Sequence, residues 1–155
     1  IRIFFVNRRF LVKNQSFVGK WGEQTSDLGW TAVPIALLFL QGKLKISPIE
    51  MNVLINLLMH WWKLDQLPYP SQDAIAYRIG VSKRTIQRAV AKLESLKIIN
   101  VVANPRGSPV FRGRNAYDLS PLVKLLDEMS MELRNDLEKH SRFKKMILMG
   151  EDKAK

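Results

Sequence analysis

The 155-residue sequence predicts a mainly α-helical chain with one small β-hairpin and a long C-terminal helix. Three observations predict this fold class. Apolar residues recur at helical spacing in four stretches that each begin with serine, a preferred helix-capping residue. Two short runs rich in β-branched or aromatic residues flank a loop that contains Pro and Gly, which is typical of a hairpin. The order of elements is helix, helix, three-residue turn, helix, hairpin, helix.

Three parts are expected from composition. Residues 1–29 are a basic arm and linker, residues 30–119 a central domain, and residues 120–155 a C-terminal helix. Within the arm, "IFFV" and "FLV" predict extended chain or a hairpin over residues 1–18. The alternative is a basic arm that orders only on a partner. Residues 22–29, "GEQTSDLG", have the composition of a linker.

The first two helices of the central domain are predicted from their start signals. Residues 31–41 indicate a short buried helix with Pro34 in its first turn. Residues 47–62 indicate a longer helix that begins with a capping box. That box consists of Ser47 as N-cap, Pro48 at the first helical position and Glu50 at the third. The aromatic side chains of Trp30, Trp61 and Trp62 are assigned to the core, and stacking on bases or lining an effector pocket is the alternative.

The next two helices are separated by the turn "GVS" at residues 80–82. Ser71 caps the first of them, and Gly80 ends it because glycine readily adopts the positive φ of a sharp turn. Val81 fills the angle between the helices, and Ser82 caps the second, which runs to about Leu96. The apolar face of that second helix consists of Ile86, Ala89, Val90 and Leu93.

Residues 98–103 and 110–119 predict the two strands of the hairpin. A long helix then begins at Ser120. Its apolar residues are spaced four, three, four and four apart, namely Leu122, Leu126, Met129, Leu133 and Leu137. We expect this seam, within residues 120–150, to form a homodimer. The alternative is that the helix folds back on its own domain, with Met129 and Met131 in the core.

This element order is that of a winged helix-turn-helix, in which the helix after the turn enters the major groove of DNA. The apolar face of residues 82–96 leaves Lys83, Arg84, Gln87 and Arg88 on the outer face. Arg and Lys pair with O6 and N7 of guanine, and Gln pairs with N6 and N7 of adenine. Ser82 and Thr85 stand at the helix start, where backbone amides favour a phosphate.

The charge pattern favours DNA contact over an ordinary solvated helix. The net charge is +11, of which +10 lies in residues 1–119. Between Asp73 and Glu94 the sequence has five cations and no acid, whereas a solvated helix face usually mixes signs. The hairpin is also basic. Its arginines, expected to bind the DNA backbone or minor groove, are Arg106, Arg112 and Arg114. The alternative is a hairpin that is merely soluble.

The stretches "YPSQDAIAYRIGVSKRTIQRAVAKLESLKII" (69–99) and "RGRNAYDLSPL" (112–122) resemble winged-helix domains of bacterial regulators and of phage and plasmid replication initiators. The preceding "VPIALLFLQGKLKISPIEMNVLINLL" resembles the lead-in of the replication-linked group. The resemblance covers about residues 33–126 and implies DNA binding. The recognition-helix positions that it implies are Ser82, Lys83, Arg84, Thr85, Gln87 and Arg88.

Other function classes lack sequence support. There is no Cys, the two His are far apart, and phosphate-loop and zinc-protease motifs are absent, so we expect no enzyme, metal site or cofactor. The longest apolar run, residues 30–40, is too short to span a membrane. RNA is disfavoured because A-form major grooves exclude a helix.

The sequence therefore predicts a cytoplasmic, sequence-specific double-stranded DNA-binding protein. Its expected role is that of a transcriptional regulator or a replication-initiation factor of a bacterium or mobile element, with transcription or replication proteins as partners. The alternative is a winged-helix subunit of a larger nucleoprotein assembly that contacts protein or binds the DNA backbone non-specifically.

Overall fold

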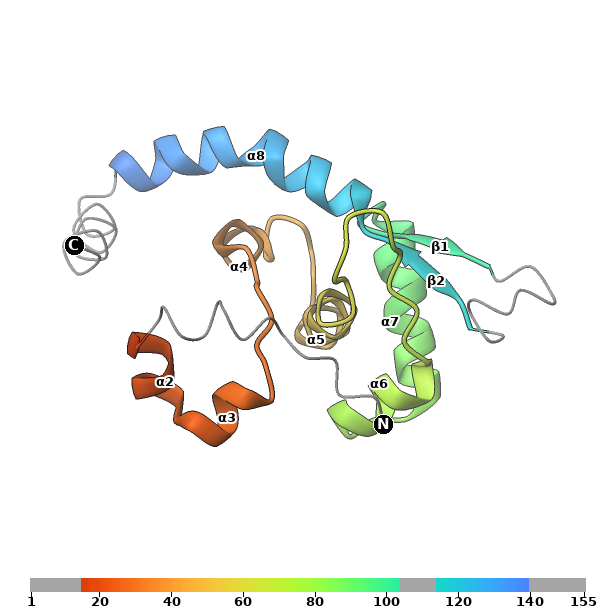
Figure 1. Ribbon diagram of the computed structural model, residues 1–155. Helices are drawn as coiled ribbons and strands as arrows, with labels where there is room; N and C mark the ends of the chain where they lie inside the picture. Colours follow the sequence, from red (N-terminus) through yellow and green to blue (C-terminus); the bar gives the residue numbers. More distant parts are fainter. Residues whose placement is uncertain (1–14, 104–113, 140–155) are drawn as a thin grey trace. The chain divides into compact units, whose positions relative to one another are not determined.

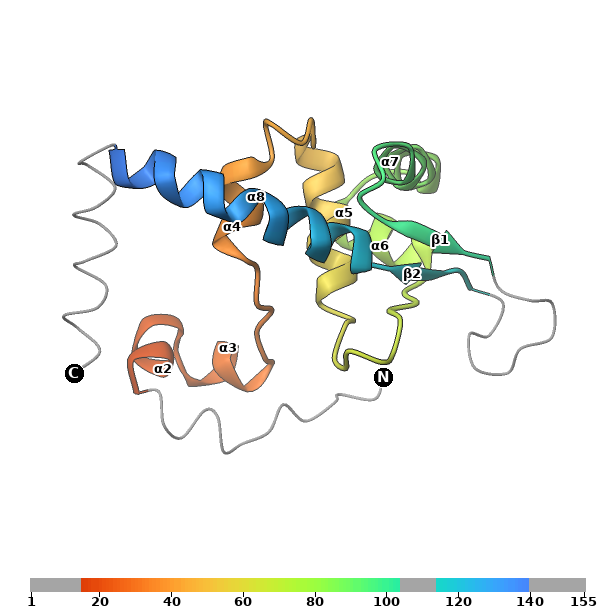
Figure 2. The same cartoon turned by 90° about the horizontal axis from the view of Figure 1, so that it is seen from above.

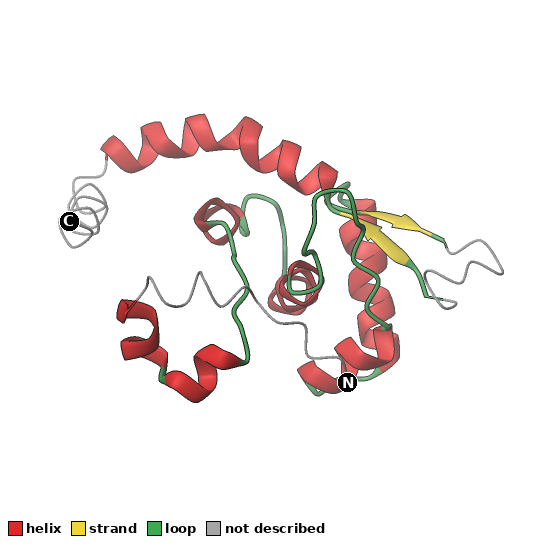
Figure 3. Ribbon diagram, viewed as in Figure 1, coloured by secondary structure: helices red, strands yellow, loops and turns green. Residues whose placement is uncertain are grey.

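The computed structural model describes residues 15–103 and 114–139. The predictions for residues 1–14, 104–113 and 140–155 lie outside these ranges. The chain divides into two compact units, residues 1–32 and residues 33–155, each of which is described by itself. Helices dominate both, and the second unit contains a single described hairpin (Figure 3).

Over its described residues, 15–32, the first unit contains two short helices, α2 (Gln15–Trp21) and α3 (Glu23–Asp27). The prediction of extended chain is therefore wrong for residues 15–18, and the linker composition of residues 22–29 conceals a helical turn. Gly22, with φ of +80°, separates the two helices. The hydroxyl of buried Ser26 donates to the carbonyl of Gly22 at 2.7 Å, a local bond that composition does not reveal. Trp30 is 41% exposed, so its assignment to the core is also wrong.

The described part of the second unit, residues 33–103 and 114–139, contains five helices and two strands. They are α4 (Ile35–Leu40), α5 (Pro48–Leu58), α6 (Gln72–Ile79), α7 (Lys83–Ser95), β1 (Asn100–Val102), β2 (Ala116–Asp118) and α8 (Ser120–Lys139). Figure 1 shows α5 and α6 beside α7, with the hairpin following α7 and α8 running back across α4. The side chains that are fully buried include Leu37, Leu54, Leu57, Ile75, Ile86, Leu93 and Tyr117.

Helix α5 begins as predicted and ends earlier. The Ser47 hydroxyl accepts a hydrogen bond from the Glu50 amide, and the Glu50 carboxylate accepts one from the Ser47 amide, which completes the capping box. The helix ends at Leu58 and not at residue 62. Trp61 follows it, half-buried against the core. Trp62 is 57% exposed, so the core assignment is wrong for this residue.

Helix α4 begins later than the predicted residue 31, and Pro34 lies just before its first turn and not in it. Pro34 is the N-cap, with φ of −60° and ψ of 132°, and the helix itself begins at Ile35. The extended ψ explains the shift, because the residue that caps a helix is not itself helical. Leu37 and Leu40 are the buried residues of this helix.

The turn between α6 and α7 has the predicted geometry. Gly80 adopts the left-handed conformation, with φ of 77° and ψ of 33°. A side chain is strained at this φ, which is why glycine suits the position. Val81 is partly buried against the core, in the angle between the two helices. The turn therefore fixes how α7 leaves α6.

The two strands pair antiparallel and are shorter than predicted, with Val101 opposite Tyr117. Ile98 and Ile99 are buried ahead of β1 and belong to the core, not to the strand. The Val101 amide donates to the Glu94 carboxylate at 3.2 Å, which holds β1 against the end of α7.

Helix α8 packs on its own domain. Leu122 and Leu126 are buried, and Met129 and Leu133 pack against the same core. An ion pair of 2.8 Å joins Lys43 to Glu132. The view from above shows α8 lying across α4 (Figure 2). These four seam positions therefore follow the fold-back alternative and do not form a free dimer seam. Met131, at 73% exposed, is not a core residue.

Candidate nucleic-acid interface

Helix α7 has two chemically distinct faces. Ile86 and Leu93 are fully buried, and Ala89 and Val90 are at most 5% exposed. The opposite face is polar and exposed, and its residues are Lys83, Arg84, Gln87 and Arg88. These four side chains and Ala91 line one open depression. The structure therefore brings together the four side chains that the sequence predicted to read bases.

The start of α7 is held by a local hydrogen-bond network. The Ser82 hydroxyl accepts from the Thr85 amide at 3.2 Å, and the two hydroxyl oxygens lie 2.9 Å apart. Ser82 is exposed and Thr85 half-buried, so both lie at the edge of the polar face. Their hydroxyls fix the first turn of α7 and thereby position Lys83 and Arg84.

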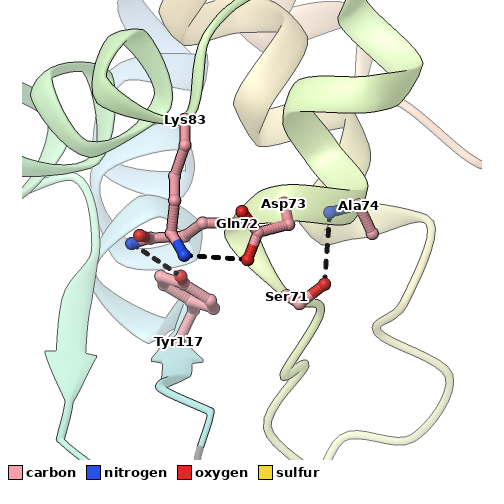
Figure 4. Close-up of polar contacts among 6 residues, drawn as sticks. All are labelled: Ser71, Gln72, Asp73, Ala74, Lys83 and Tyr117. Carbon is pink, nitrogen blue, oxygen red and sulfur yellow. Dashed lines mark hydrogen bonds and ion pairs between the residues drawn. The ribbon is translucent and has the colours of Figure 1, made fainter.

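Lys83 has an acidic partner that the sequence reasoning missed. Its ammonium Nζ lies 2.8 Å from Oδ2 of Asp73 on α6 (Figure 4). The prediction that the cations of this segment are unopposed is therefore wrong for Lys83. Asp73 precedes it by ten residues, but the tight turn between α6 and α7 brings the two side chains together.

Arg78 is also engaged within the domain. Its Nη1 donates to Oδ1 of Asn56 at 3.3 Å and lies 3.2 Å from Nε2 of His60. Because arginine has no acceptor, Nε2 of His60 accepts, which requires the Nδ1–H tautomer. Burial, followed by the charges of Arg78 and Arg114, lowers the pKa of His60. Arg78 thus ties α6 to α5 through neutral partners.

Of the three predicted hairpin arginines, Arg114 lies within the described residues, whereas Arg106 and Arg112 lie outside them. Arg114 is exposed just ahead of β2. It lines a small pocket together with Lys83 of α7 and the first turn of α6. The remaining lining residues are Pro70, Ser71, Gln72, Asp73, Asn115 and Tyr117.

The base of the hairpin is anchored to the helix-turn-helix at two points. The Tyr117 amide donates to the carbonyl of Pro68 at 2.9 Å. Nε2 of Gln72 donates to the Tyr117 phenol oxygen at 3.4 Å (Figure 4). Burial raises the pKa of Tyr117, and the hydrogen bond from Gln72 opposes that shift. These bonds set the position of the hairpin base and of Arg114 just ahead of β2.

Three residues of this surface escaped sequence reasoning. Asp73 and Gln72 belong to the first turn of α6, and their partners are distant in sequence. Ala91 lies four residues after Gln87, so helical spacing alone would have placed it on the polar face. Ala91 lines the depression together with the polar side chains, and its small side chain leaves the depression open.

Neither a metal-binding cluster nor a membrane-spanning helix occurs among the described residues. Over residues 15–103 and 114–139, no three His, Asp or Glu side chains are grouped so that they could hold a metal ion. Within the same ranges, no helix has the length and apolarity needed to cross a membrane.

Residues 44–99 match the family model of a helix-turn-helix domain. The match spans α5, α6 and α7, and the β1–β2 hairpin follows it directly. Residues 44–99 and the hairpin that follows them therefore have the fold of a winged helix-turn-helix. This confirms the predicted fold class and, over residues 44–99, the predicted resemblance to helix-turn-helix domains. In such domains the helix that corresponds to α7 is the one that lies in the DNA major groove.

One solved structure similar to this chain is the crystal structure of the S. aureus MepR–DNA complex. The sequences are 17% identical, the alignment covers 94% of this chain and 99% of that chain, and the TM-score is 0.43. This likeness is loose, and the fold assignment rests on the family match and on the geometry above. No curated protein sequence matches the chain.

Proposed function

We propose that this protein is not an enzyme and that it binds double-stranded DNA sequence-specifically through α7 and the hairpin. A single observation carries the proposal, namely the polar face of α7. Four side chains with the chemistry of base readout line one open depression, directly opposite a face that is buried in the core. A solvated helix does not require cationic and amide groups at these particular positions.

Each residue of the polar face has a proposed role. Arg84 and Arg88 pair with guanine edges, and Gln87 pairs with an adenine edge. Lys83, at the first position of the helix, contacts a base edge or its flanking phosphate. Small Ala91 lets the groove wall approach the helix, since a larger side chain there would fill the depression.

The DNA backbone is contacted by the helix start and by the hairpin in this proposal. Ser82 and Thr85 hold the first turn of α7 towards a phosphate. Arg114, together with the sequence-predicted Arg106 and Arg112, follows the adjacent strand. Neutralising about 6 to 10 phosphates would make the affinity fall steeply with rising salt.

The biological role that we propose is transcriptional regulation or replication initiation in the cytoplasm of a bacterium or of the host of a mobile element. No cofactor is needed for either role. A homodimer would place two recognition helices about 34 Å apart, on successive turns of DNA. Because four seam positions of α8 are used within the domain, such a dimer would form through other faces of residues 120–150.

The test is selection of bound duplexes from a random DNA pool at about 150 mM salt, where purely electrostatic binding is screened. Wild-type protein should enrich a motif, and an inverted repeat would indicate a dimer. The double variant Arg84→Ala, Arg88→Ala should enrich none. The control Lys124→Ala, Lys139→Ala removes the same charge from exposed positions of α8 and should enrich the wild-type motif.

A second candidate function is a winged-helix subunit that contacts protein or binds the DNA backbone without reading bases. The Lys83–Asp73 ion pair favours the protein-contact form of this candidate, since it withdraws one cation from the polar face. Folded wild-type protein that enriches no motif would support this candidate and contradict base readout. The genomic positions of an enriched motif would separate an operator from a replication origin.

A further inference from the structure

Asp73 and Lys83 form an ion pair at the point where the polar face of α7 meets the pocket shared with Arg114. Oδ2 of Asp73 lies 2.8 Å from Nζ of Lys83. The side chains of the two residues remain 69% and 52% exposed, respectively. The pair is thus open to solvent and to any ligand that approaches the start of α7.

We propose that Asp73 is an internal competitor for the DNA phosphate that Lys83 would otherwise bind. The carboxylate holds the ammonium in the free protein and so lowers the affinity for DNA backbone of any sequence. This inference rests on the proposed function, because it assumes that α7 faces DNA. It makes Asp73 a specificity-determining residue that itself contacts no base.

The ion pair is not needed to hold α6 and α7 together. The Ser71 hydroxyl already caps α6 by accepting from the Ala74 amide at 3.1 Å (Figure 4). The angle between the helices is set by Gly80 and by the packing of Val81 and Ile86. Exposed ion pairs contribute little to stability, so removing this one should leave the stability of the domain nearly unchanged.

The Asp73 carboxylate also lowers the affinity for a phosphate in a second way, through the electrostatics of the pocket. Lys83 and Arg114 line the pocket from two different elements and together favour an anion. Among the described residues that line it, Asp73 is the one acid. A phosphate placed between the two cations would lie close to this carboxylate and be repelled by it. Both effects weaken backbone contact.

Specificity follows because the carboxylate acts on one kind of contact and not on the other. Non-specific binding consists almost entirely of phosphate contacts, whereas base contacts add to specific binding. Among the described residues, neither Arg84 nor Arg88 forms an ion pair with an acid, so both remain available for base edges. Asp73 therefore raises the ratio of specific to non-specific affinity.

The experiment measures binding of the full chain to a random-sequence 20-base-pair duplex over a series of salt concentrations. Asp73→Asn should bind roughly two- to fivefold tighter than wild type, which is the range expected from releasing an exposed ion pair. Its plot of log affinity against log salt should be steeper by about 0.9, the slope of one added phosphate contact. Glu138→Gln, with the same change in net charge near the far end of α8, should match wild type.

A second pair of variants tests whether Asp73 acts through Lys83. In the Lys83→Met background, Asp73→Asn should have a clearly smaller effect than in wild type, because only the repulsion between carboxylate and phosphate remains to be removed. A full effect that persists without the ammonium would overturn the proposal. Misfolding cannot imitate the expected result, because an unfolded variant binds DNA more weakly and not more tightly.

The remaining outcomes separate this inference from the proposed function. Wild-type protein that binds the duplex, with Asp73→Asn unchanged, contradicts the competitor role and leaves DNA binding intact. Folded wild-type protein that binds neither random nor selected duplexes contradicts both proposals together.

Discussion

Gln72, in the first turn of α6, donates a hydrogen bond of 3.4 Å to the phenol oxygen of Tyr117 in β2. The two residues are 45 positions apart in the sequence. Tyr117 is fully buried, so its ring lies in the core while its oxygen reaches the helix-turn-helix. This contact places the hairpin base beside the start of α7. The position of Arg114, the candidate DNA-binding residue just ahead of β2, depends on it.

Changes at Tyr117 should separate packing from hydrogen bonding. Tyr117→Ala should lower the free energy of unfolding by about 3–5 kcal/mol, as for other large aromatic side chains removed from a core. Tyr117→Phe should cost at most about 1 kcal/mol, because the bond to Gln72 is long. Urea unfolding measures both. Tyr77→Ala, at a residue 90% exposed, is the control and should stay within about 0.5 kcal/mol. A loss as large for Phe as for Ala would contradict this account.

The double variant Arg84→Ala, Arg88→Ala should weaken binding to a selected duplex by about tenfold or more. Each well-formed contact of this kind contributes about 1–3 kcal/mol of discrimination. The melting temperature should barely change, because both side chains are exposed. Fluorescence anisotropy and thermal unfolding measure the two effects, with Lys124→Ala, Lys139→Ala as the charge-matched control. Parallel losses of affinity and melting temperature would assign these arginines to the fold.

Arg114→Ala should weaken binding to all duplexes to a similar degree. The salt plot should become shallower by about 0.9, since one phosphate contact is lost. Titrations with a selected and a random duplex at four salt concentrations provide the measurement, and Lys124→Ala is the single-charge control. An unchanged slope would remove Arg114 from the interface.

Leu126→Ala should destabilise the protein by about 2–5 kcal/mol without changing its oligomeric state. Leu126 is 7% exposed and packs on the core of its own domain. Met131→Ala, on the exposed side of the same helix, should cost no more than about 0.5 kcal/mol. Urea unfolding and sedimentation velocity test both variants. Conversion of a dimer to a folded monomer by Leu126→Ala would show that the seam lies between two chains.

His60 should make the domain less stable in mild acid. Burial and the charges of Arg78 and Arg114 hold its folded pKa below the usual 6.5. The unfolded chain therefore binds more protons in the window below 6.5, and stability falls as the pH drops through that window. Urea unfolding at pH 7.5 and 5.5 should show the loss, and His60→Gln should reduce it. An equal loss in the variant would place the titrating group elsewhere.

Much of the helix-turn-helix could be predicted because its signals are local. The caps at Ser47, Ser71 and Ser82 are bonds to residues three positions away, and the structure confirms all three. The left-handed Gly80 follows from its own lack of a side chain. The polar face of α7 follows from helical periodicity. One local feature was nevertheless missed, namely α3 within the predicted linker of residues 22–29. The hydroxyl of buried Ser26 donates to the carbonyl of Gly22 there, and the composition of the segment gives no sign of this bond.

The sequence by itself determined the order of the elements from α5 to α8, the starts of α5, α6 and α7, and the face of α7 that carries the candidate base-reading residues. These depend on neighbours within a few residues. Only the tertiary structure decided that Asp73 holds Lys83, that Gln72 holds Tyr117, and that the α8 seam packs on its own core. Those contacts join residues that come together after the chain has turned, so no short pattern encodes them.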